Sequence, residues 1–178
     1  WFFKVVSADR GDIWAFIPGV YRAPDAKDSH AFIMVLDGAR HRSTFHRFEL
    51  GDFSASRKKL EIHLGANRFT AAGMQLHIDD GLRQIAGDIE FESVQPWPVR
   101  LVSPGAMGWY AFVPFMECYH GVLSFDHALQ GRLQIDGTLH AFDGGRGYIE
   151  KDWGRSFPSA YIWMQSNHFS TPGVSLMA

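Results

Sequence analysis

The first half of the chain is built from short stretches in which apolar and polar residues alternate. Leu60, Ile62 and Leu64 fall on one side of an extended segment, whereas residues 31–36 are apolar throughout, as in a buried strand. Asp79-Asp80-Gly81 separates two such stretches, and glycine accepts the positive φ that a hairpin turn requires. No helical stripe of ten or more residues is found in this half. We therefore predict strands at residues 1–7, 13–21, 31–36, 43–50, 60–64, 74–78 and 82–92.

Residues 93–107 interrupt this alternation because they contain Pro96, Pro98 and Pro104. Proline has no amide donor and is excluded from central strands, so we predict a linker or a crossing loop here. A tryptophan near each end of the segment is expected to anchor it onto a core. Residues 108–120 are predicted to be irregular, since they contain Pro114.

Two further strand regions are expected after this interruption. One runs from residue 120 to residue 129. The other, residues 133–142, is either a hairpin around Asp136-Gly137 or one strand with a bulge at that point. Short strands with frequent turn signals favour an all-β fold, an antiparallel barrel or sandwich.

The composition gives less information about function than the alternation of apolar and polar residues gives about the fold. A chain of 178 residues can bury one sizeable core. The net charge of −2 gives no electrostatic argument for nucleic acid. Aromatic residues make up 15% of the chain, which points to an apolar ligand. The single cysteine excludes an internal disulfide, and no apolar run approaches the roughly 18 residues of a membrane span.

The aromatic and ionisable side chains with possible catalytic or binding roles are most concentrated between Gly144 and Phe169. Its early glycines indicate a tight turn. If residues 161–168 form a strand, two aromatic and two amide side chains share one face, as in a polar-ended cavity: Tyr161, Trp163, Gln165 and Asn167. Tyr148 and Trp153 could line the same pocket, and Glu150, Lys151, Asp152 and His168 could transfer protons there. The alternative is an ordinary core strand that follows a glycine-rich turn.

Two segments, GRGYIEKDWGRSFPSAYIWMQSNHF (residues 145–169) and WYAFVPFMECYHG (residues 109–121), resemble the tocopherol cyclase family. The openings WFFKVV and DIWAFIPGVY are similar to that family's first strands. A weaker likeness, over residues 145–154, extends to hydroxyneurosporene synthase-like proteins. The resemblance implies a lipocalin-like (calycin-type) β-barrel in a two-barrel chain. We therefore expect residues 1–157, with the linker near 93–107, to form a first barrel and residues 158–178 to open a second, in a chain truncated at both ends.

The resemblance also implies an activity. Tocopherol cyclases are intramolecular lyases of the isomerase class, which protonate a prenyl double bond and let a phenol oxygen attack the resulting cation. Such chemistry needs a carboxylic acid kept protonated by burial, aromatic rings around the cation and a dry cavity. It requires no metal, nucleotide or flavin, so we expect no cofactor. The expected ligand is a small prenylated aromatic molecule, with peripheral membrane contact as one route by which it is collected.

Glu150 is the preferred acid, because it occupies the acidic position of the family-like Tyr-x-acid-x-x-Trp-Gly pattern. The structural alternative is a surface pair with Lys151. Asp152 is the second candidate, or else stabilises the turn at Gly154. The other catalytic candidates are His120 and His168, as bases for the phenol, and Glu117, as a further buried carboxylate. The candidates for the cage are Trp109, Tyr110, Tyr148, Trp153, Tyr161 and Trp163, with Gln165 and Asn167 at its polar end.

The sequence offers weaker support for other chemistries and functions. His41 and His46 lie among arginines and are interpreted as a solvated loop, not a metal site, and residues 57–59 as a solvated basic run. Cys118 and His120 could pair on one strand face, although no further partner is evident. Two alternatives to a cyclase stay open: acid-catalysed hydration or cyclisation of another terpenoid, and a non-catalytic carrier of an apolar molecule. We expect a cytoplasmic protein, or a plastid one if the source is a plant.

Overall fold

The computed structural model describes residues 1–171 and 173–178, and it is built almost entirely of strands. The strands are β1 (Phe2–Val6), β2 (Ile13–Tyr21), β3 (His30–Asp37), β4 (Arg42–Phe48), β5 (Phe53–Ala55), β6 (Glu61–Leu64), β7 (Asn67–Thr70), β8 (Gly73–Asp79), β9 (Gln84–Glu92), β10 (Cys118–Ile135), β11 (Thr138–Ala141), β12 (Gly145–Gly154), β13 (Gln165–Ser166) and β14 (Leu176–Met177). The helical elements in the described residues are three short 3₁₀ turns, η1 (Ala26–Asp28), η2 (Leu50–Asp52) and η3 (Gly108–Phe112). The all-β prediction is confirmed.

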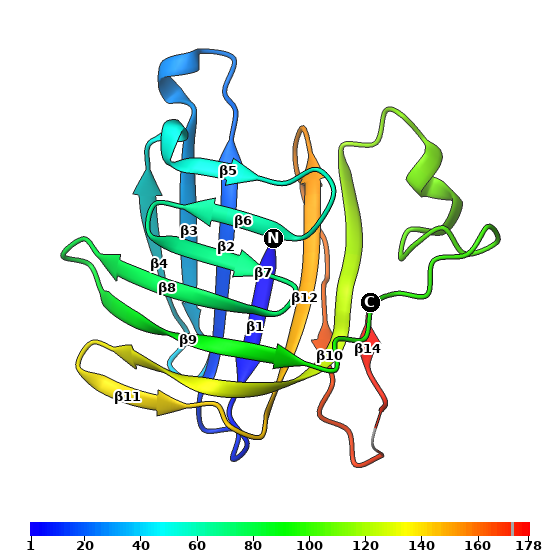
Figure 1. The fold of residues 1–178 in the computed structure, drawn as a ribbon. Coiled ribbons are helices and arrows are strands. Elements are labelled where there is room, and N and C mark those ends of the chain that lie inside the picture. The colour runs from blue at the N-terminus through cyan, green and yellow to red at the C-terminus, as the bar shows by residue number, and fades with distance from the viewer. Residues whose placement is uncertain (172) are drawn as a thin grey trace.

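Twelve strands form one antiparallel sheet in the order β4-β3-β2-β1-β12-β10-β9-β8-β7-β6-β5, and β11 pairs with β10 beside this path. The sheet curls so that β5–β9 lie across β1–β4, as Figure 1 shows. Within the described residues no pairing joins the two end strands, β4 and β5, so the sheet is not closed by hydrogen bonds. β13 and β14 pair separately as a small second sheet.

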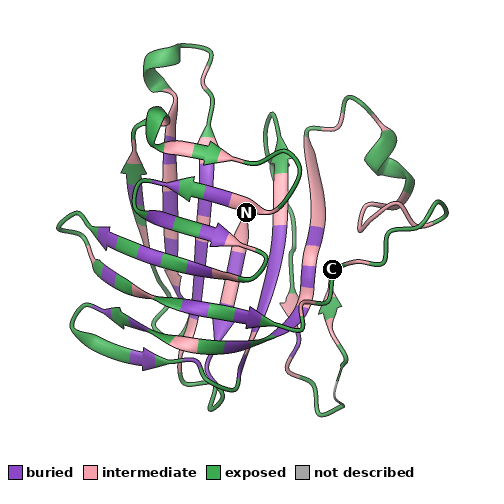
Figure 2. Cartoon of the chain, viewed as in Figure 1, coloured by how far each residue is buried: buried purple, intermediate pink, exposed green. Residues whose placement is uncertain are grey.

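The core lies inside the curled sheet because alternate residues of each strand point inward. Figure 2 shows this alternation on β8, where Met74, Leu76 and Ile78 are buried between exposed neighbours. Phe3 on β1 and Ile149 on β12 belong to the same core. Glu150 therefore lies on the outer face of β12.

The turn predicted at Asp136-Gly137 is confirmed, whereas the tight turn predicted from the early glycines of residues 144–147 includes only Gly144, because Gly145 and Gly147 lie in β12. Asp136 and Gly137 both have positive φ, 50° and 82°, and they join β10 to β11, so the hairpin alternative is correct. The bulges of β10 lie elsewhere, between Val122 and His127 in its pairing with β12. The linker predicted at residues 93–107 is confirmed, and the irregular segment predicted at 108–120 is confirmed up to residue 117, with η3 and an isolated bridge as its regular elements. Residues 118–120 are not irregular, because β10 begins at Cys118.

Two predictions about local structure are wrong. Residues 161–168 do not form one strand. Only Gln165 and Ser166 are in a strand, β13, which pairs with β14 and not with the main sheet. His46 is not part of a solvated loop. It lies on β4, is 1% exposed, and its Nδ1 is 2.6 Å from Oδ2 of Asp80.

Candidate active site

Glu150 is held by the middle of β12, between β1 and β10. Its Cα partners in the sheet are Phe2 on one side and Val122 on the other. The segment that follows β12 turns back and runs behind β12 and β10 in the view of Figure 1, and its Trp163 packs against Phe2 and Tyr148 on this outer face. As a result, Glu150 is only 5% exposed although it faces away from the core.

The Glu150 carboxyl lies close to Tyr148 and His120, and His120 connects it to Asp152. The Tyr148 hydroxyl donates a hydrogen bond of 2.6 Å to its Oε2. The same oxygen lies 3.7 Å from Nε2 of His120. The other ring nitrogen of His120, Nδ1, is 2.7 Å from Oδ1 of Asp152. The bond to Asp152 fixes the tautomer in which Nδ1 carries a proton and leaves Nε2 beside Glu150, where it is buried without a hydrogen-bond partner in the described residues.

Burial raises the pKa of Glu150, because an ionised carboxylate loses solvation here. The Tyr148 hydroxyl and His120 act in the opposite direction but do not cancel this effect. The pKa of His120 is also raised, chiefly by its hydrogen bond to Asp152. Burial, and then the bond to Glu150, raises the pKa of Tyr148, so that its hydroxyl stays a donor. The cluster therefore holds protons to higher pH than isolated side chains would.

Three aromatic rings pack against one another on the same side of β12 as the carboxyl. The ring centroid of Trp163 lies 5.3 Å from that of Phe2 and 6.5 Å from that of Tyr148, and the rings of Phe2 and Tyr148 are 6.5 Å apart. Tyr148 is fully buried, whereas Trp163 is 38% exposed and forms the outer side of the cluster. Aromatic faces attract cations, so the group combines a buried acid with a surface that tolerates positive charge.

The cluster also contains a set of possible metal ligands. One ligand atom from each of His120, Glu150 and Asp152 lies within 4.8 Å of the others. The expectation that the site works without a metal stays a prediction. Two cavities, of about 250 and 110 Å³, are lined by other residues, so Glu150 lies in neither of them.

The sequence model of the family described as tocopherol cyclase-like matches residues 67–178, which is more than half of the chain and includes the whole His120–Glu150–Asp152 cluster. The chain belongs to the tocopherol cyclase-like family.

Two curated relatives are similar over shorter segments. One is the Zea mays protein "Tocopherol cyclase, chloroplastic", 35% identical over 68 residues, which cover 38% of this chain and 14% of the maize protein. The other is the Oryza sativa subsp. japonica protein "Probable tocopherol cyclase, chloroplastic", 35% identical over 63 residues, or 35% of this chain and 13% of the rice protein. The alignments thus span a small part of either relative. No solved structure matches the chain significantly. The described residues include no helix long and apolar enough to cross a membrane.

Several predicted site residues lie outside the cluster. Glu117, predicted to be buried, is exposed just before β10. Trp109 and Tyr110 on η3 are 61% and 67% exposed, and Tyr161 is 67% exposed, because these residues lie in segments outside the main sheet. Trp153 shares the face of Ile149 instead of that of Glu150, and stacks on Tyr119 with ring centroids 5.6 Å apart.

The three polar residues near the C-terminal end have separate surroundings. Gln165 accepts a hydrogen bond of 2.5 Å from Lys4. Asn167 is fully buried and donates to Asp126 and to the Gly147 carbonyl oxygen, at 3.0 and 2.9 Å. His168 lines the smaller cavity, where burial and nearby cations lower its pKa.

Two sets of residues shape the site although the sequence did not point to them: Phe2 and Lys4 on β1, and Asp126 with Arg146. Phe2 and Lys4 reach the outer face of β12 because β1 pairs with it, a contact across nearly 150 residues of chain. The pKa of Lys4 is lowered to about 8 by burial. Asp126 receives the Arg146 side chain as well as Asn167, and so ties the C-terminal segment to the sheet. Alternation along β1 predicts which of its residues share a face, but not the strand against which they pack.

Proposed function

We propose that the protein performs tocopherol cyclase-like catalysis, the acid-catalysed ring closure of a prenylated hydroquinone to a chromanol. The supporting observation is the buried Glu150 carboxyl, with its raised pKa, between the Tyr148 hydroxyl and His120. An acid of this kind stays protonated where an exposed glutamate is ionised. Membership of the tocopherol cyclase-like family makes this reaction the first one to test.

In the proposed reaction Glu150 transfers its proton to the less substituted carbon of the prenyl double bond. The new C–H bond leaves a tertiary cation, and the rings of Phe2, Tyr148 and Trp163 stabilise it by roughly 0.5–2 kcal/mol each. The phenol oxygen attacks the cation and forms the C–O bond of the chromanol. No electron is gained or lost, and no other molecule is consumed, as expected of an intramolecular lyase.

His120 completes the proton cycle. Its Nε2 accepts the proton that the phenol releases, because Nδ1 is occupied by Asp152. The distance of 3.7 Å between Nε2 and Oε2 of Glu150 lets a small movement return that proton to the carboxylate. Asp152 acts as a positioning residue through His120. His168, the other base predicted from the sequence, is the less favoured choice because it lines a different cavity.

The architecture proposed around this site is a lipocalin-like barrel formed by residues 1–157, with residues 158–178 as the start of a second barrel. In this arrangement the substrate reaches Glu150 from the side that Trp163 covers, so that segment moves when the ligand binds. We further propose that the ligand is a prenylated aromatic molecule, collected by peripheral membrane contact, and that a plant homologue of this chain would act in plastids, in keeping with the printed names of the maize and rice relatives.

The test is turnover of a prenylated hydroquinone by Glu150→Gln in the full-length protein. Glutamine keeps the shape but cannot donate the proton, so turnover should fall by roughly 10²-fold or more while binding survives. Glu150→Asp should retain part of the activity, because shortening the arm misplaces the acid. Glu90→Gln, an exposed glutamate on β9, is the matched control and should be unaffected. An active Glu150→Gln variant would transfer the role to Asp152.

The same protein, variants and hydroquinone also distinguish an enzyme from a non-catalytic carrier. A carrier would bind the hydroquinone with saturable quenching of tryptophan fluorescence, release it unchanged, and show no dependence on the Glu150 proton. Absence of product from a folded protein that binds the ligand would therefore favour a carrier. Hydration of a terpenoid would give an alcohol in place of a ring, and mass analysis distinguishes the two because only hydration adds water.

A further inference from the structure

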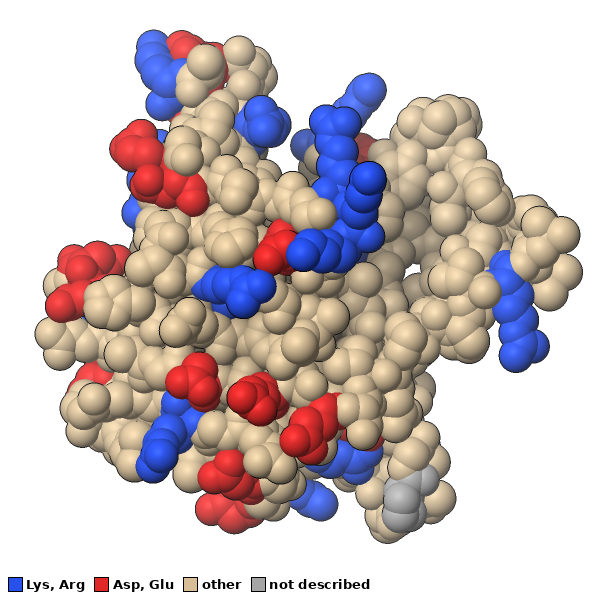
Figure 3. Space-filling model, in the orientation of Figure 1, with Lys and Arg blue, Asp and Glu red and all other residues tan. Residues whose placement is uncertain are grey.

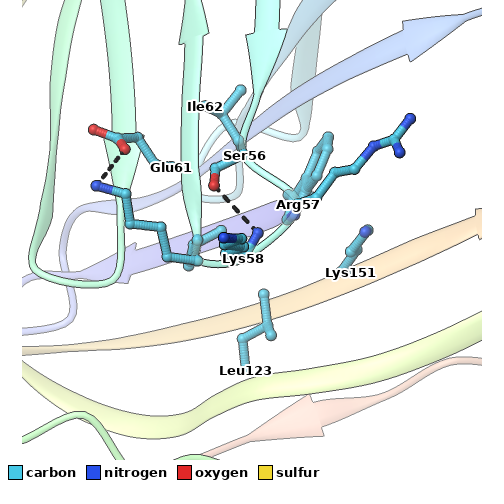
Figure 4. Close-up of a pocket in the computed structure, with 10 residues that line it drawn as sticks. Ser56, Arg57, Lys58, Glu61, Ile62, Leu123 and Lys151 are labelled. Carbon is cyan, nitrogen blue, oxygen red and sulfur yellow. Dashed lines mark hydrogen bonds and ion pairs between the residues drawn. The ribbon is translucent and has the colours of Figure 1, made fainter.

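The larger cavity, of about 250 Å³, lies at one end of the curled sheet and has a different character from the Glu150 cluster. It is bounded by the loop between β5 and β6, residues 56–60, together with Trp1, Leu123 on β10 and Lys151 on β12. Figure 4 shows Lys58, Leu123 and Lys151 around this space. Lys151 follows Glu150 directly in a strand, so the two side chains leave β12 on opposite faces.

The floor of this cavity is apolar and continues into the core. Ile62 is fully buried, and Trp1, Leu60 and Leu123 pack against the core cluster while remaining partly exposed at the cavity. The ring of Trp1 lies 6.1 Å from that of Phe53. An alkyl chain or ring placed here would therefore be removed from water on an existing apolar surface.

The rim of the cavity is basic. Arg57, Lys58, Lys59 and Lys151 all line it, and Figure 3 shows Lys and Arg side chains gathered over the loop after β5. Lys59 pairs with Glu61 at 2.7 Å. For Arg57, Lys58 and Lys151 no ion pair with a carboxylate is found in the part of the chain that the structure describes. The rim thus carries more positive charge than its one acidic residue balances, although the whole chain has a net charge of −2.

Lys151 connects the rim to the floor. Its Nζ lies over the Trp1 ring, 4.9 Å from the centroid, and 5.1 Å from that of Trp153. These contacts hold the ammonium group at the cavity, where burial of part of its surroundings strengthens its attraction to an anion. The reaction proposed for Glu150 does not use this ammonium group.

We propose that this cavity is a binding site for an amphipathic anion, with a carboxylate or phosphate on the basic rim and an apolar chain on the floor. Arg57, Lys58 and Lys151 hold the anionic group, and Trp1, Leu60 and Leu123 contact the chain. The anion is either a dissolved amphiphile or the headgroup of an anionic lipid in a membrane. The proposal does not depend on the proposed cyclase activity, because the site uses the opposite face of β12.

The test begins with calorimetric titration of the full-length protein with laurate, a dissolved twelve-carbon carboxylate, and with dodecyl maltoside, which has the same chain but no charge. We expect saturable binding of laurate that weakens as salt screens the rim, and no binding of the maltoside. The double variant Arg57→Glu/Lys58→Glu should bind laurate about tenfold more weakly or worse, because it replaces two attractive charges by repulsive ones. Lys151→Met should also weaken binding.

The matched control is Arg22→Glu/Arg47→Glu, which makes the same change in net charge at exposed positions outside this cavity. It should bind laurate as the unchanged protein does. Arg57 and Lys58 are exposed, so their replacement should leave the fold intact, and the thermal midpoint checks this. Equal laurate binding by the two double variants would overturn the proposal, since it would show that the rim charges do not hold the anion.

Vesicle sedimentation then separates the two sources of the anion. Vesicles of phosphatidylcholine with phosphatidylglycerol, compared with pure phosphatidylcholine, present the charged headgroup in a membrane. Sedimentation that requires phosphatidylglycerol and is lost in Arg57→Glu/Lys58→Glu assigns the site to lipid headgroups. Binding of laurate without sedimentation assigns it to a dissolved amphiphile. Failure of both probes to bind the unchanged protein overturns the proposal, whatever the outcome for cyclase activity.

Discussion

Replacing Tyr148 by phenylalanine removes one hydroxyl from the Glu150 cluster and leaves the aromatic ring in place. That hydroxyl donates a bond of 2.6 Å to the carboxyl and lowers the pKa of Glu150 against the dominant effect of burial. We therefore expect the pKa of Glu150 to rise further in Tyr148→Phe. Because Glu150 is proposed to act in its protonated form, the alkaline limb of the turnover profile should move to higher pH.

The size of the shift follows from the hydrogen bond. A bond to an ionised carboxylate contributes about 1.5–3 kcal/mol, and one to a neutral carboxyl about 0.5–1.5 kcal/mol. The difference, about 1–1.5 kcal/mol, corresponds to about one pKa unit, since one unit equals about 1.4 kcal/mol. Tyr148 is fully buried, so water does not readily replace the lost donor.

The assay is NMR titration of the carboxyl carbon of Glu150, assigned by comparison with Glu150→Gln. It needs no substrate and therefore tests the electrostatics separately from the proposed reaction. Tyr119→Phe is the matched control, because the Tyr119 hydroxyl donates to the Val113 carbonyl oxygen and not to a carboxylate. An unchanged or lowered pKa of Glu150 in Tyr148→Phe would refute the reasoning.

Three other predictions concern neighbouring groups. Burial lowers the pKa of His127 to about 4, so folding favours its neutral form. The contribution of this residue to the free energy of unfolding should be fully present above the unfolded pKa of about 6.5 and fall by up to about 3 kcal/mol as the pH drops from there through about 4. In urea denaturation across that pH window, His127→Gln should lose less stability than the unchanged protein. Asn167→Ala removes two buried hydrogen bonds and should lower the free energy of unfolding by about 1–3 kcal/mol. An unchanged denaturation midpoint would contradict the role of Asn167 in holding the C-terminal segment against the sheet. Prolonged dialysis against EDTA should leave turnover unchanged, whereas excess Zn²⁺ should inhibit turnover by binding to His120, Glu150 and Asp152. Activity that is lost to EDTA and restored by a metal would contradict the proposed acid chemistry.

The sequence by itself determined the local structure of most of the sheet. Alternation identified most of the larger strands, because a strand buried on one face places every second residue in the core. The ten residues of β12 were not predicted as one strand, because the glycines at its start were interpreted as a tight turn. The turns at Gly81 and Gly137 were also readable, since both glycines adopt the positive φ that other residues avoid. The short strands β5 and β7 were missed, because three or four residues are too few to show a period. Glu150 stood out because it occupies the acidic position of a family-like motif.

Only the tertiary structure decided what surrounds Glu150. His120 meets Asp152 because β10 pairs with β12, which brings together residues 32 positions apart, and Phe2 joins them through β1. Residues 161–168 alternate like a strand, yet Trp163 covers Glu150 and Tyr161 is exposed, because only Gln165 and Ser166 have a strand to pair with. Alternation states which residues share a face, but hydrogen bonding between distant segments determines which faces meet, and that choice depends on the packing of the whole chain.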